Sequence, residues 1–178
     1  MHAEGLTLST GYGDRERLVF GATQVSLQPG EVLVVDGDQE AASRLLWVLS
    51  GRMKASGGDV KTVGLVLPEE SGSVRRRTRL IDLAAPALAT AKDRVAAIVA
   101  ARDCDAQLIM VDHLDRIGSG AESAALVELF HSAATSGRGV VATAADANAV
   151  DDLLPARYLH LNLPTVGRPQ SQLAAVPA

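Results

Sequence analysis

The chain has 178 residues and a net charge of −4, with 47% apolar and 21% charged residues. These values predict one globular domain with a sizeable core and exclude a disordered chain. The negative charge argues against a nucleic-acid-binding protein, which is normally basic. Because Cys104 is the only cysteine, no intrachain disulfide partner exists for it. No apolar stretch reaches the roughly 18 residues of a membrane span, and no signal peptide is evident, so we expect a cytoplasmic protein.

Strand patterns open the chain. Residues 6–9 alternate weakly, as in an edge strand, and residues 18–27 contain a second strand that ends at a Gln28-Pro29-Gly30 turn. Two such strands ahead of a buried strand predict a small antiparallel β-subdomain that lies against a parallel core.

The stretch from Gly30 to Gly51 organises the rest of the chain. Residues 32–35 are apolar and β-branched, as in a buried strand, and a polar turn leads to a helix at 41–49. Strand, tight turn and helix is the setting in which glycine-rich backbone N–H groups and a Lys bind phosphate. The pattern G-x-x-x-x-G-K-[ST] is absent, since the stretch offers Gly37 but no Lys.

The second half alternates strands and helices, which is typical of a parallel sheet. Its clearest buried strand is QLIMVD, which ends at Asp112. The other expected elements are a strand at 59–66, Ala-rich helices within 80–101, a helix at 122–134, a strand at 139–143, a short helix at 147–154 and a strand at 157–163. The histidines and the cysteine are scattered, so no His/Cys metal motif is visible, and no G-x-S-x-G nucleophile elbow is present.

This ordered series resembles the nucleotide-binding domain of ATP-binding cassette (ABC) proteins. Val25-Ser26-Leu27 followed by residues 29–32 is similar to the approach to that family's P-loop. Residues 92–101 before LIMVD resemble the helix that leads into Walker B, and residues 139–143 resemble the strand before the switch histidine.

The resemblance implies a three-layer α/β P-loop NTPase fold, with a small antiparallel β-subdomain and a reduced helical subdomain. It covers nearly the whole chain, so we expect one ABC-ATPase-like domain at residues 1–163. A flexible C-terminal tail is expected at 164–178.

The resemblance also assigns candidate nucleotide-binding residues. Counting forward from Gly30, in the turn before the strand, places Gly37 on the first P-loop glycine and Ser43 on the lysine. Counting back from the glycine after the helix places Ala42 on the lysine, so the loop is one residue short. Neither count supplies a lysine. Arg44 is the nearest cation, and Glu40 adds a carboxylate that would repel phosphate.

Other candidate residues lie outside the loop. Asp112 matches the Walker B aspartate, which helps to hold Mg²⁺, and His113 stands where active members carry a catalytic Glu. His113 could take a proton near neutral pH, although the two residues could equally cap the strand. Glu69 stands where the Q-loop glutamine is expected, and Tyr12 is a candidate for stacking on adenine or an ordinary surface residue.

Two further family motifs are replaced. The sequence ALATA at 87–91 stands in place of the LSGGQ signature, and Ala144-Ala145-Asp146 stands where the switch histidine is expected. P-loop Lys, Q-loop Gln, signature, catalytic Glu and switch His are therefore all missing. This favours a cassette-like subunit that does not hydrolyse ATP and acts as a structural or regulatory partner of a membrane transport system.

Two alternatives stay open. One is a divergent ATPase that binds ATP and Mg²⁺, with Arg44 or a partner's Lys on the phosphates, Asp112 for Mg²⁺ and His113 as the base. The other is a stand-alone regulatory or scaffold module. If the chain is the cassette-like subunit that does not hydrolyse ATP, the expected partner is a transmembrane transporter subunit or another ABC-type subunit at the inner face of the membrane.

The basic segment from Arg75 to Arg79 is either the docking surface for that partner or a solvated loop.

Overall fold

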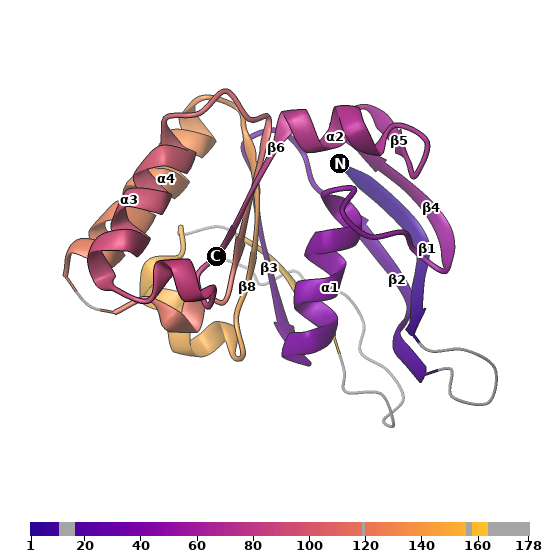
Figure 1. Ribbon diagram of the computed structural model, residues 1–178, viewed down its shortest axis with the longest axis horizontal. Helices are drawn as coiled ribbons and strands as arrows, with labels where there is room; N and C mark the ends of the chain where they lie inside the picture. Colours follow the sequence, from indigo (N-terminus) through magenta and orange to yellow (C-terminus); the bar gives the residue numbers. More distant parts are fainter. Residues whose placement is uncertain (11–16, 119, 156–157, 164–178) are drawn as a thin grey trace.

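Two sheets form the framework of the molecule, and helix α1 (Gln39–Leu49) lies between them (Figure 1). A computed structural model describes residues 1–10, 17–118, 120–155 and 158–163. The antiparallel sheet has the order β2 (Arg17–Ser26), β1 (His2–Thr10), β4 (Gly57–Thr62), β5 (Leu65–Leu67). The other sheet has the order β6 (Thr78–Asp82), β7 (Leu108–Asp112), β8 (Gly139–Thr143), β3 (Val32–Gly37), β9 (Leu159–Leu163), and all its pairings are parallel.

The apolar side of α1 joins the two sheets into one core. Its leucines pack in a single cluster with side chains from the antiparallel sheet and from one face of the parallel sheet. The members that define this cluster are Leu6, Phe20, Val25, Leu33, Val35, Leu45, Leu46, Leu49, Met110 and Val141. Burial of α1 on two sides explains why leucine, valine and alanine fill its buried positions.

The opposite face of the parallel sheet is covered by α3 (Ala91–Arg102) and α4 (Ala121–Thr135), as Figure 1 shows. A second cluster there contains Ile98, Leu126, Leu129, Phe130, Val34, Ile109, Val111 and Val140. Every residue of β7 and β8 is buried, because both faces of a parallel sheet are covered by other elements. The parallel sheet that the alternating strands and helices predicted is confirmed, and the strands ending near Val35, Thr143 and Asp112 lie side by side in it.

Three local predictions were wrong. Residues 59–66 form a hairpin, β4–β5, because Val63 and Gly64 both have positive φ and reverse the chain. Residues 80–101 are not two helices, since they include strand β6, a 3-10 turn at Pro86–Leu88 and α3 alone. The expected edge strand at 6–9 is the longer β1, which lies between β2 and β4.

The remaining short elements are helix α2 (Ser71–Arg77) and two 3-10 segments. The basic segment, for which a solvated loop was one of two expectations, begins in helix α2 and runs into β6. Two further 3-10 segments span Leu114–Arg116 and Ala147–Leu153. No described helix combines the length and the apolar character needed to cross a membrane. The expected tail at 164–178 lies outside the described residues.

Candidate functional site

A buried carboxylate, Asp112, ends strand β7 and gathers polar side chains from its neighbours. Asp112 is 2% exposed, and its Oδ1 accepts hydrogen bonds from Ser43 Oγ (2.9 Å), Gln39 Nε2 (3.4 Å) and Thr143 Oγ1. Ser43 and Gln39 belong to α1, and Thr143 ends β8. The carboxyl ends of parallel strands share one edge of a sheet, and this is where ligands of such folds bind.

The environment of Asp112 works against its charge. Burial raises the pKa of the Asp112 carboxyl above its usual range, while the hydrogen bonds from Thr143 and Ser43 oppose that effect. A buried acid with a shifted pKa at the carboxyl edge of a sheet marks a candidate functional site.

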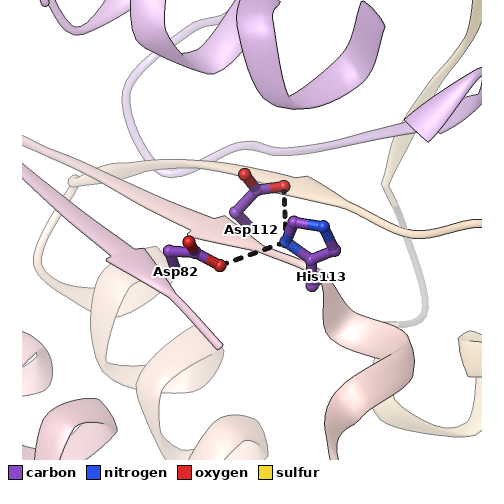
Figure 2. Close-up of side chains that lie close together, drawn as sticks. All are labelled: Asp82, Asp112 and His113. Atoms are coloured by element: carbon purple, nitrogen blue, oxygen red, sulfur yellow. Dashed lines mark ion pairs between the residues drawn. The ribbon is translucent and has the colours of Figure 1, made fainter. Parts of the chain in front are cut away.

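His113 completes a cluster that the sequence did not reveal. Its backbone is left-handed, with φ 64°, and its N–H donates to Thr143 Oγ1 at 3.0 Å. Figure 2 shows its ring beside two carboxylates: Nδ1 lies 3.2 Å from Asp82 Oδ1 and 3.4 Å from Asp112 Oδ1. Asp82 was missed because its strand, β6, was assigned to a helix. The available signal was that Asp82 directly follows the apolar pair Leu80-Ile81, just as Asp112 closes LIMVD.

The connection between β3 and α1 is a single residue, Asp38. Gly37 ends the strand, Gln39 begins the helix, and Asp38 is the N-cap, whose side chain accepts from Ala41 N at 3.0 Å. In a P-loop, several residues between strand and helix wrap around the phosphate groups. Here a carboxylate occupies the position at the helix N-terminus that an anion would take.

Gly37 serves packing against β9. It has a φ of 100°, and a Cβ at this position would collide with the backbone carbonyl of Leu163. The N–H of Asp38 donates to the same carbonyl oxygen at 2.8 Å. The glycine that matched the first P-loop position is therefore required by the close approach of β9.

The structure favours the count made backward from Gly51, which places Ser43 on the P-loop Ser/Thr position. The Ser43 hydroxyl donates a hydrogen bond to Asp112, as a residue at the Ser/Thr position would and a residue at the lysine position would not. Ala42 then falls on the lysine position, and it is fully buried. The nearest cation, Arg44, forms an ion pair with Glu40 at 2.9 Å, one helical turn earlier.

Directly after the segment that replaces the signature, the first turn of α3 also carries a carboxylate, Asp93. Thr90 caps α3, and its Oγ1 accepts from Asp93 N at 3.2 Å and donates to Asp93 Oδ2 at 2.6 Å. Glu69 lies in the turn between β5 and α2. Figure 1 shows α2 near one end of the parallel sheet, whereas α1 begins at the other end. The structure therefore does not bring Glu69 to Asp112. Tyr12 lies outside the described residues.

Mg²⁺·ATP does not fit these residues. The strand–helix connection leaves no loop to enclose phosphate, and acidic side chains occupy the first turns of both α1 and α3. Asp112 Oδ1 already accepts hydrogen bonds from protein side chains. The described residues offer the polar cluster at the end of β7 in place of a phosphate cradle.

Comparison with solved structures places the fold. An ATP-binding subunit of an ABC transporter matches with a TM-score of 0.67 and 15% identity, over 93% of this chain and 89% of that one. CbiO1 from Clostridium perfringens, part of the ABC transporter complex CbiONQ, matches with a TM-score of 0.65 and 12% identity, over 92% and 84%. The ATP-binding cassette MJ0796, bound to ADP and Pi, matches with a TM-score of 0.62 and 13% identity, over 91% and 95%. No protein-family model and no curated protein matches the sequence.

The chain thus has an α/β fold of the P-loop NTPase class. In particular, it has the fold of ABC transporter ATP-binding subunits, with a parallel sheet, an antiparallel sheet and a reduced helical part. This confirms the fold predicted from the ordered strand and helix series.

Proposed function

We propose that this chain is a cassette-like subunit that does not hydrolyse ATP and that docks on a membrane transport subunit or on an intact ATPase subunit. The observation that carries the proposal is the one-residue connection between β3 and α1, where Asp38 caps the helix. A chain selected for hydrolysis needs the loop, its Lys and a catalytic Glu. This chain keeps the scaffold around those parts and replaces each of them.

The energetic cost to nucleotide binding is large. Charge-assisted hydrogen bonds contribute roughly 1.5–3 kcal/mol each. Losing the lysine and placing a carboxylate at the helix N-terminus would therefore cost about 3–5 kcal/mol of binding free energy. That corresponds to roughly 100- to several-thousand-fold in affinity.

Calorimetric titration with Mg²⁺·ATP tests this directly. We expect no saturable binding at micromolar nucleotide, no turnover and little rise in melting temperature, because nothing replaces the lost phosphate contacts. MJ0796, whose solved structure holds ADP, provides the positive control. Saturable binding that Asp112→Ala abolishes, and that the exposed neighbour Asp115→Ala leaves intact, would support the divergent ATPase instead.

A group of exposed arginines supports the docking role. Arg52, Arg75, Arg76, Arg77 and Arg79 are all exposed, and no ion pair to any of them is present within the described residues. Partial burial of its guanidinium, and then the positive charges of Arg75 and Arg79, lower the pKa of Arg52, so these three arginines influence one another. Such a patch of like charges suits an acidic partner surface.

The arginines and the Asp112 cluster lie at opposite ends of the parallel sheet. Arg75, Arg76 and Arg77 end α2, and Arg79 is the second residue of β6, whereas Asp82 ends that strand three residues later, about 10 Å away. The structure therefore keeps the proposed docking surface apart from the polar cluster.

A further inference from the structure

Three potential metal ligands meet at the carboxyl ends of β6 and β7. Asp82, Asp112 and His113 each offer one ligand atom, and these atoms all lie within 4.8 Å of one another. His113 Nδ1 lies 3.2 Å from one carboxylate and 3.4 Å from the other (Figure 2). Two ligands of a tetrahedral ion with bonds of about 2.0–2.1 Å stand roughly 3.3 Å apart. Both distances from His113 Nδ1 are therefore compatible with ligand atoms that share one ion.

Among the three ligand atoms, His113 Nδ1 is the one without a hydrogen bond in the described part of the chain, since Asp82 Oδ1 accepts from Ala84 N at 2.9 Å and Asp112 Oδ1 accepts from Ser43 and Thr143. His113 Nδ1 is buried, and its 3.2 Å and 3.4 Å contacts with the two carboxylates are ion-pair contacts and not hydrogen bonds. Asp112 Oδ2 receives no hydrogen bond from the described residues, whereas Oδ1 receives several. A buried nitrogen without a hydrogen bond that faces two carboxylates is an arrangement that a bound cation would stabilise.

The backbone holds the imidazole in this place. His113 adopts the left-handed region, which a residue with a Cβ rarely occupies, and its N–H is fixed by Thr143. Strain of this kind persists where the surrounding structure requires it, often at a functional site.

We propose that Asp82, Asp112 and His113 bind one transition-metal ion, with Zn²⁺ as the representative, in the absence of nucleotide. Imidazole nitrogen is a ligand for zinc, copper, iron and nickel, and carboxylate oxygens complete zinc sites. The three protein ligands leave a fourth position to water. The ion joins the ends of β6 and β7, so it ties the edge strand of the sheet to its neighbour.

The test is a zinc titration of metal-free protein against a chromophoric chelator, with no nucleotide present. We expect one ion per chain, and Asp82→Asn and His113→Gln should each weaken zinc binding on the order of 100-fold or more. His131→Gln, an exposed histidine on α4, is the matched control and should bind zinc as the parent does. Co²⁺ in place of Zn²⁺ should give the intense visible bands of a tetrahedral site, and these should disappear in Asp82→Asn.

Absence of one-to-one zinc binding by the parent protein would overturn the site. Equal affinity of the parent and both ligand variants would do the same, since it would assign the ion to a scattered surface group. If His113→Gln does not fold by circular dichroism, Asp82→Asn decides, because its side chain is 40% exposed. Since the assay contains no ATP, its failure leaves the proposed lack of nucleotide binding intact.

Discussion

At the scale of single residues, glycine and aspartate define the turn before α1. Gly37 lets β9 approach, and Asp38 then supplies both the cap and a bond to β9. The sequence predicted a tight turn after the strand, but it could not distinguish a glycine kept for phosphate from one kept for a passing strand. That distinction depends on Leu163, which is far away in the chain.

Gly37→Ala should lower the free energy of unfolding by about 2–4 kcal/mol. The new methyl group would force apart β3 and β9, and the positive φ adds its own cost of about 1 kcal/mol or more. Gly64→Ala is the matched control, because Gly64 also has a positive φ but faces open space. It should lose only about 1 kcal/mol. Equal losses in chemical denaturation would contradict the packing role of Gly37.

At the scale of elements, one ion pair fixes α3 to α4. Arg94 Nε lies 2.5 Å from Glu122 Oε1, and the two side chains are only 18% and 6% exposed. Arg94 also donates to the carbonyl of Leu88, and Glu122 Oε2 accepts from Gly118 N. The hydrogen bond from Arg94 holds the pKa of Glu122 below its usual range. The sequence predicted both helices, but this pairing could not be derived without knowing that the helices are neighbours.

Glu122→Gln should lower the free energy of unfolding at pH 7 by about 3 kcal/mol, because it leaves Arg94 without its charge partner. A lowered pKa in the folded state stabilises the protein above the ordinary pKa of Glu, about 4.5, and this stabilisation is lost as pH falls through the folded value. The variant should therefore show a flatter loss of stability in acid than the parent. Glu128→Gln, exposed on the same helix, should follow the parent in urea unfolding across pH. Parallel pH profiles for Glu122→Gln and the parent would refute this role.

At the scale of the whole molecule, much of the order of elements was readable, and so were Asp112 and His113, but Asp82 was not. Buried parallel strands such as LIMVD are continuous apolar runs, so their adjacency followed from the pattern. Strand β6 was missed because it is short, lies at the edge of its sheet and adjoins an Ala-rich stretch. That error removed Asp82 from view and, with it, the cluster around His113.

The separation of the arginine patch from Asp112 predicts independent behaviour. Changing Arg75, Arg76 and Arg77 to Glu should abolish co-purification with a membrane transport subunit from the same genome, because an acidic partner would then be repelled. Lys92→Glu with Arg116→Glu, also exposed but on other elements, is the control and should retain the complex. Circular dichroism should show an unchanged fold in both variants. Co-purification that survives the triple reversal at physiological salt would refute the docking surface.

The closed connection between β3 and α1 has a consequence for any assembly that contains this subunit. A one-residue connection whose aspartate already caps the helix has no ligand-bound and ligand-free states to alternate between. In the proposed role, the surface shown to a partner stays the same throughout a transport cycle. The conformational changes that time the cycle must then come from another member of the complex, and this subunit keeps one conformation throughout.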